Sequence, residues 1–306
     1  MSLTVYHFHF AQSDRIVWLC EELSLLIPTF KYTLKTFPRG LDTSVGKQEI
    51  LKIVPAGTTP AIHDTTVNPP VAMTESQGIV MYILAVHGKG HLQPPPPGPD
   101  SPTTPQEWAQ YCFWLSFANG SFQAFVNVDI YAASLFANGI NNEQEFKNGI
   151  VHQSYSARTP NHLKQYETRL SKSKYLAGEE FTAADIMQIY GLTLLRLIYP
   201  IDLTEYPNIR RWLKDITSRK GYKNAMDKAE DGIPALYQPT TPLVTFEVLL
   251  SANPWHSIDG LRKLKEEQDP EWKVEDSTFE RLTPGPDALQ AIKENLKDLP
   301  TNRMAA

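Results

Sequence analysis

The chain has 306 residues, a formal net charge of −5 and 42% apolar residues. This length suits two domains with substantial cores. Acidic and basic residues are mixed, which argues against a nucleic-acid partner because a phosphate backbone needs a basic stripe. No apolar run approaches the roughly 20 residues that span a bilayer, and the first residues, MSLTVYHFHF, lack the features of a signal peptide. We therefore expect a cytoplasmic protein with no membrane partner.

Strand and helix patterns alternate in the first third of the chain. β-Branched and aromatic residues predict strands at residues 3–8, 30–34 and 61–64. Apolar residues at helical spacing predict a helix over residues 16–23, and a later helix that takes Ser76 as its N-cap. This order of elements is typical of a small α/β domain.

The remaining sequence separates into a connector, a helical region and a charged extension. Four successive prolines, Pro94 to Pro97, lie in a Gly-, Pro- and Ser-rich stretch and predict a stiff connector. Helical periodicity follows, and Thr182 and Asp185 form a capping box at one helix start. The predicted divisions are 1–86 for the α/β domain, 87–105 for the linker, 106–229 for the all-helical domain and 230–306 for the C-terminal extension.

The extension carries apolar residues as well as charges. Those between Leu236 and Trp255 would be an aggregation hazard if they stayed exposed. We therefore expect this segment to pack on the helical domain or on a partner subunit. A further helix is predicted at residues 287–299.

Four segments, taken in order, carry a resemblance to a known family. They are residues 13–23 (SDRIVWLCEEL), 54–62 (VPAGTTPAI), 74–79 (TESQGI) and 175–186 (YLAGEEFTAADI). Together they resemble the cytosolic glutathione transferases, over about residues 3–228. The resemblance implies a thioredoxin-like α/β N-terminal domain followed by an all-α C-terminal domain, glutathione as the cofactor, and a homodimer.

The resemblance also implies where glutathione would bind. A cis bond before Pro60 would turn the backbone of Thr59 outward, so that it pairs with the cysteinyl backbone of the tripeptide. Glu75 would bind the α-ammonium group, and the Ser76 hydroxyl with its helix N-terminus would bind the α-carboxylate. The alternative is that Ser76 is only an N-cap and Glu75 only a first-turn acid. The implied glutathione-binding residues are Gln12, Thr58, Thr59, Pro60, Glu75 and Ser76.

The residue that activates the thiol is less clearly marked. A free thiol has a pKa of about 8.5, so a hydrogen-bond donor and a positive field are needed to form the thiolate at neutral pH. Ser13 lies near the N-terminus of the first helix and is the first candidate, although the serine of serine-type members would fall on Ala11. Tyr6 is the rival, at the position of the tyrosine-type members. Gln12 could donate through its amide if neither hydroxyl reaches the sulfur.

The histidines near the N-terminus and the two cysteines are the other candidates for metal binding or thiol chemistry. His7 and His9 would share one face of a strand, but no third Cys, His or acid stands at a supporting spacing, so we expect no metal site. The two cysteines, Cys20 and Cys112, form no CxxC motif. Cys20 falls on the apolar stripe of the first helix, which favours a buried structural thiol.

The predicted activity is the presentation of glutathione thiolate to an apolar small-molecule electrophile. If the adduct is kept, the protein is a conjugating transferase. If the thiolate adds to a conjugated alkene and leaves after bond rotation, the protein is a cis-trans isomerase, as in the family members of fungal secondary metabolism. The alternative is a non-catalytic glutathione- or ligand-binding module of the same fold, which Ala11 motivates.

Overall fold

The computed structural model describes residues 1–37, 44–137, 158–244 and 255–272. Its N-terminal part is built on a four-stranded sheet of order β2-β1-β3-β4. Strand β1 (Leu3–Phe8) runs parallel to β2 (Tyr32–Phe37) and antiparallel to β3 (Ala61–Asp64), which pairs with the antiparallel β4 (Val71–Thr74). The predicted α/β domain is confirmed, although β2 begins two residues later than predicted.

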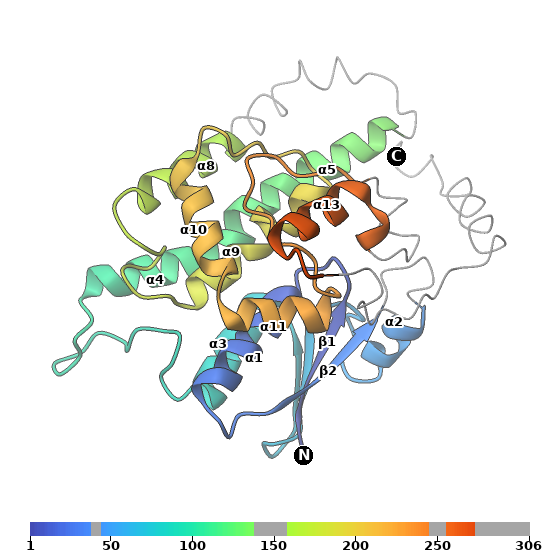
Figure 1. Ribbon diagram of the computed structural model, residues 1–306. Coiled ribbons are helices and arrows are strands. Elements are labelled where there is room, and N and C mark those ends of the chain that lie inside the picture. The colour runs from blue at the N-terminus through green and yellow to red at the C-terminus, as the bar shows by residue number, and fades with distance from the viewer. Residues whose placement is uncertain (38–43, 138–157, 245–254, 273–306) are drawn as a thin grey trace, which may run out of the picture.

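Helices cover both faces of this sheet (Figure 1). Helices α1 (Asp14–Leu26) and α3 (Ser76–His87) lie on one face, and α2 (Ser44–Leu51) lies on the other. Because side chains alternate along a strand, Val5 of β1 belongs to the core with α1 and α3, whereas Tyr6 packs in a separate cluster with Ile50 and Val54. The same alternation turns His7 toward α1 and away from α2.

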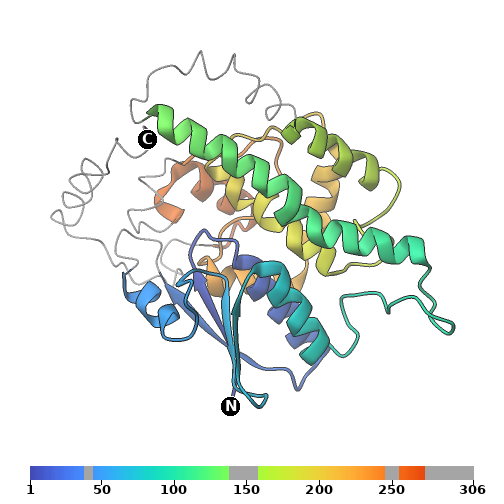
Figure 2. The ribbon, with the colours of Figure 1, turned by 180° about the vertical axis from the view of Figure 1, so that it is seen from behind.

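The C-terminal part is helical, as predicted. Seen from behind, α4 and α5 form one long rod across this domain (Figure 2), joined by a π-helical turn, η1. Residues 88–104, before α4, contain no helix or strand. The described elements are α4 (Pro105–Phe117), η1 (Ala118–Phe122), α5 (Gln123–Ala137), α8 (Arg158–Leu170), α9 (Ala183–Leu192), the 3-10 turn η2 (Leu194–Leu197), α10 (Pro207–Thr217), α11 (Lys220–Ala229), the 3-10 turn η3 (Trp255–Ser257) and α13 (Asp259–Gln268).

The two domains share one hydrophobic core, in which α1 is the central element. Its Trp18 is fully buried and contacts the rings of Phe181 and Tyr222 from the helical domain. Arg219 forms an ion pair with Glu22 of α1 at 2.8 Å. Helix α11 therefore lies along α1 (Figure 1), and the residue after its last turn, Glu230, lies 3.1 Å from His7 of β1.

Two local sequence signals are confirmed. The Thr182 and Asp185 capping box is formed at the start of α9, with the Asp185 carboxylate accepting from the Thr182 backbone N–H at 3.0 Å. Cys20 is fully buried in α1, and burial raises the pKa of its thiol. In the described part of the chain, no helix has the length and apolar character needed to cross a membrane.

The described part of the extension is packed on the helical domain, as its apolar residues predict. Trp255 is 2% exposed and donates its indole N–H to the Asp231 carbonyl at 2.9 Å, while Leu261 is fully buried. The buried guanidinium of Arg196 donates to the backbone carbonyls of Leu236, Gln238 and Pro239. Residues 245–254 and the helix predicted at 287–299 lie outside the described residues.

Candidate glutathione site

A cis peptide bond joins Thr59 to Pro60, as the sequence predicts. Pro60 is buried, Thr59 is half-buried and Thr58 is exposed, so the backbone before β3 borders the surface. The next residue, Ala61, pairs with Tyr6 of β1 on one side and with Thr74 of β4 on the other. This register places the cis bond beside the start of α3.

Helix α3 begins differently from the sequence prediction. Ser76 was expected to be the N-cap, but Glu75 occupies that position, and Ser76 is the first residue of the helix. The reason is a backbone angle of φ 74° at Glu75, which is unusual for a residue with a Cβ atom and can persist only where the surroundings enforce it. The Glu75 side chain is exposed, whereas Ser76 is 2% exposed.

The Ser76 hydroxyl belongs to a buried polar cluster centred on Arg15. This hydroxyl accepts a hydrogen bond from Asn119 Nδ2 at 2.8 Å and one from Arg15 Nη1 at 3.3 Å. Arg15 Nη1 also donates to Asn119 Oδ1 at 2.7 Å and to Gln12 Oε1 at 3.3 Å, and its Nη2 donates to Gln123. The cluster therefore joins the first turns of α1 and α3 to the π-helical turn and the start of α5.

The charge of this cluster is notable because Arg15 is fully buried. Burial lowers the pKa of the Arg15 guanidinium, and the neighbouring Asp14 carboxyl opposes that shift. Among the described residues, the guanidinium of Arg15 donates only to neutral side chains, and its Nε has no hydrogen-bond partner. A buried cation with only neutral partners carries a desolvation cost that an anionic ligand can offset.

The Asp14 carboxyl, at the start of α1, is itself buried. Burial raises its pKa to about 8, with the Glu230 carboxylate contributing in the same direction, while Arg15 opposes both. Its Oδ2 has no hydrogen-bond partner in the described part of the chain. Its Oδ1 accepts from the Arg15 backbone N–H at 2.6 Å, and among the described residues the Asp14 carboxyl makes no hydrogen bond to the Arg15 guanidinium.

Sequence reasoning did not find Arg15, Asn119 or Gln123. Arg15 stands inside the first recognised motif, and its place in the first turn of a helix was the available signal. No motif in the sequence around Asn119 indicates a binding or catalytic role. It enters the cluster because the π-helical turn from Ala118 to Phe122 redirects side chains between α4 and α5, and such turns occur frequently at functional sites.

The three candidate thiol donors occupy different positions. Ser13 is fully buried, does not cap α1 with its side chain, and has its Oγ 2.7 Å from Nδ1 of His7. Tyr6 is buried on the opposite face of the sheet, and burial raises its pKa, with Glu49 adding to the effect. Gln12 is half-buried and its amide oxygen bridges Arg15 and Gln123. Of the three, only Gln12 lies within the Arg15 cluster.

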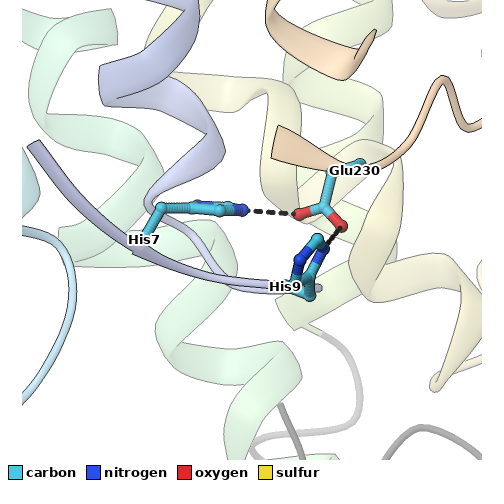
Figure 3. Close-up of side chains that lie close together, drawn as sticks. All are labelled: His7, His9 and Glu230. Carbon is cyan, nitrogen blue, oxygen red and sulfur yellow. Dashed lines mark ion pairs between the residues drawn. The ribbon is translucent and has the colours of Figure 1, made fainter. Parts of the chain in front are cut away.

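A second group lies at the end of β1, where Glu230 meets two histidines (Figure 3). Its Oε1 is 3.1 Å from Nε2 of His7, and its Oε2 is 3.6 Å from Nδ1 of His9. Burial alone would raise the pKa of Glu230, but the hydrogen bonds and charges of the two histidines lower it to about 2. The sequence spacing of His7 and His9 offered no third ligand, but α11 brings the distant Glu230 to them.

Comparisons with known proteins agree with this architecture. A family model described as Glutathione S-transferase, C-terminal domain, matches residues 143–220. Glutathione S-transferase 3 of Schizosaccharomyces pombe is 26% identical over 241 residues, which cover 77% of this chain and 91% of that protein.

Solved structures share the fold. A glutathione transferase from Actinobacillus pleuropneumoniae superimposes with a TM-score of 0.57 at 22% identity, covering 74% of this chain and 92% of its own. One from Phanerochaete chrysosporium, in complex with oxidised glutathione, has a TM-score of 0.54 at 20% identity and covers 74% and 96%. The chain thus has the glutathione transferase fold, and its sequence is similar to that of glutathione transferases.

Proposed function

We propose that this chain is an enzyme that binds glutathione and presents its thiolate to an apolar electrophile. The observation that carries the proposal is the buried Arg15 cluster, which meets the first residue of α3 beside the cis Thr59-Pro60 bond. The glutathione-bound neighbour from Phanerochaete chrysosporium supports the choice of ligand.

In the proposed complex, the cysteinyl backbone and the charged γ-glutamyl end of glutathione each contact a complementary group of the protein. The outward backbone of Thr59 pairs with the cysteinyl residue in strand fashion, next to Thr58 and Pro60. The exposed Glu75 carboxylate takes the α-ammonium group. The Ser76 hydroxyl and the N-terminus of α3 take the α-carboxylate, with Arg15 supplying a positive charge behind Ser76.

The thiol is then placed near the N-terminus of α1, whose partial positive charge favours a thiolate. We assign the contact with sulfur to Gln12, because it is the partly exposed member of the three candidates. Ser13 donates only if its hydroxyl leaves His7, and Tyr6 would have to cross the sheet. Measuring the pKa of bound glutathione in Gln12→Ala, Ser13→Ala and Tyr6→Phe separates these roles, since only the donor's variant should raise that pKa.

Two outcomes follow from the same thiolate. In conjugation, sulfur displaces a leaving group or adds to an alkene, and the adduct is released. In isomerisation, sulfur adds to a conjugated alkene, the former double bond rotates as a single bond, and the carbanion expels the thiolate. The second outcome is motivated by a finer resemblance to the glutathione-dependent isomerase of pseurotin biosynthesis. Mass balance distinguishes the two, because only conjugation consumes glutathione.

A non-catalytic binding module is the second candidate function. It is favoured by Ala11, where serine-type members carry the serine, and by the full burial of Ser13. Such a module would bind glutathione with an unshifted thiol pKa, whereas the enzyme would lower that pKa.

We also propose a cytoplasmic homodimer. Met81 of α3 and Phe113 of α4 are 54% and 43% exposed, which supports a contact with a second copy over these two helices. Light scattering of Met81→Glu and Phe113→Glu tests this, since a charged residue in the contact should shift the protein toward monomers.

A further inference from the structure

We propose that His7, His9 and Glu230 form a binding site for a divalent transition metal of the zinc class (Figure 3). This is the one group of three or more His, Cys, Asp or Glu side chains with converging ligand atoms in the ranges that the structure describes. It lies outside the proposed glutathione site and serves a different purpose, because it joins the end of β1 to the residue that follows α11.

The spacing of the ligand atoms fits such an ion. Tetrahedral zinc with bonds of about 2.0–2.1 Å holds its ligand atoms roughly 3.4 Å apart. Glu230 Oε1 is 3.1 Å from His7 Nε2, and Oε2 is 3.6 Å from His9 Nδ1. All ligand atoms lie within 4.8 Å of one another. His9 is 15% exposed and follows the last residue of β1, so we expect its ring to rotate toward His7 when the ion binds.

The residues around the ligands hold them in place. The Phe10 backbone N–H donates to both oxygens of Glu230, at 2.9 and 3.1 Å, and so fixes the carboxylate beside the histidines. Ser13 Oγ lies 2.7 Å from His7 Nδ1 and fixes that ring. Outer partners of this kind orient the ligands and are typical of metal-binding histidines.

Besides the rotation of His9, binding requires a change of tautomer at His7. Without metal, the Glu230 carboxylate beside Nε2 favours the Nε2–H tautomer of His7, in which Nδ1 accepts from the Ser13 hydroxyl. With metal, the proton resides on Nδ1 and is donated to Ser13 Oγ, which rotates to accept it, while Nε2 binds the ion. Three protein ligands leave a fourth position for water, which enters on the side of the partly exposed His9.

Two domains contribute to this site, so the ion should act as a cross-link. His7 and His9 come from the thioredoxin-like domain, and Glu230 is the C-cap of α11, the helix that ends the helical domain. Because the ion binds only when the domains are docked, it should raise the melting temperature of the folded chain.

The test uses the full-length chain after treatment with a chelator. Co²⁺ is titrated with visible absorption as the readout, and Zn²⁺ is titrated by calorimetry. We expect one equivalent to bind, with a rise in melting temperature.

His9→Gln and Glu230→Gln should each weaken binding by at least about 100-fold, and Ser13→Ala by about tenfold, as for an outer partner. His91→Gln, at an exposed histidine, is the matched control and should bind as the unmodified chain does.

Circular dichroism confirms that each variant is folded before its affinity is compared. One equivalent bound with unchanged affinity in both His9→Gln and Glu230→Gln would overturn the proposal, because the ion would then sit elsewhere. The absence of saturable binding to the unmodified chain would also overturn it, and His7, His9 and Glu230 would then form only an ion-paired cluster without a metal. His9→Gln should keep its glutathione affinity, so the outcome is independent of the proposed function.

Discussion

Nη1 of Arg15 donates to Oδ1 of Asn119 at 2.7 Å, so the first helix of the thioredoxin-like domain is bound to the π-helical turn of the helical domain. The same asparagine donates to Ser76 at 2.8 Å. One side chain of the helical domain thus positions both groups that we propose to face the glutathione α-carboxylate.

Replacing Asn119 should therefore weaken glutathione binding without unfolding the protein. Asn119→Ala removes one hydrogen bond to Arg15 and one to Ser76, and we expect a loss of about 1–2 kcal/mol in the free energy of binding. Calorimetry gives the value. Gln77→Ala is the control, because Gln77 also bonds across the domains, to Ser116 at 2.9 Å, but lies outside the cluster. Equal affinities of the two variants would show that Asn119 has no special role.

Glu75 is the proposed partner of the glutathione α-ammonium group. Glu75→Ala should leave that cation unpaired and weaken binding by about 1.5–3 kcal/mol, as for a hydrogen bond to a charged group. Glu107→Ala is the matched control, since Glu107 is also an exposed acid at a helix start. Calorimetric affinity that stays unchanged in Glu75→Ala would exclude this assignment.

Asp14 should make stability depend on pH. Burial raises its pKa in the folded state to about 8, far above the ordinary value of 3.8, so the folded chain binds more protons than the unfolded chain between these values. The free energy of unfolding should consequently fall as the pH rises from about 4 to about 8, by at most about 1.4 kcal/mol per pH unit.

Urea unfolding at several pH values measures this dependence. Asp14→Asn should flatten it and be relatively more stable at pH 8 than at pH 5. Asp215→Asn, at an exposed aspartate of α10, should keep the dependence of the unmodified chain. If Asp14→Asn retains the full slope, the Asp14 carboxyl is not its source.

The C-terminal extension should be required for stability. Truncation after Asp231 removes Leu236, Trp255 and Leu261 from the core and deprives Arg196 of the three carbonyl partners that the extension supplies. We expect a lower melting temperature. Trp255→Ala should reproduce part of the effect, at about 3 kcal/mol for a buried tryptophan. If the truncated chain keeps its melting temperature and its oligomeric state by light scattering, the extension is dispensable and this prediction is wrong.

The features that could be predicted from the sequence are local. The Thr182 capping box and the alternation of strand and helix depend on residues a few positions apart, whereas the cis Thr59-Pro60 bond was implied by the family resemblance of residues 54–62. The predicted N-cap of α3 was wrong by one residue, since Glu75 and not Ser76 caps the helix. The positive φ of Glu75 is imposed by its surroundings, and the sequence has no glycine there that would indicate it.

The features that could not be predicted depend on distant residues. Asn119 is 104 positions from Arg15, and Glu230 is 220 positions from Phe10, whose N–H holds it. Neither pairing follows from spacing or propensity, because the first arises where η1 meets the start of α1 and the second where α11 packs along α1. The roles of Ser13, Tyr6 and Gln12 remain predictions.

The most direct test of the proposed function is the ionisation state of bound glutathione. The thiolate absorbs in the ultraviolet where the thiol does not, so a pH titration of the complex, with S-methylglutathione as the reference ligand, gives the pKa of the bound sulfur. We predict a pKa below the ordinary value of about 8.5, with substantial thiolate at neutral pH. A bound thiol that titrates as in free glutathione would contradict the enzyme and favour the binding module.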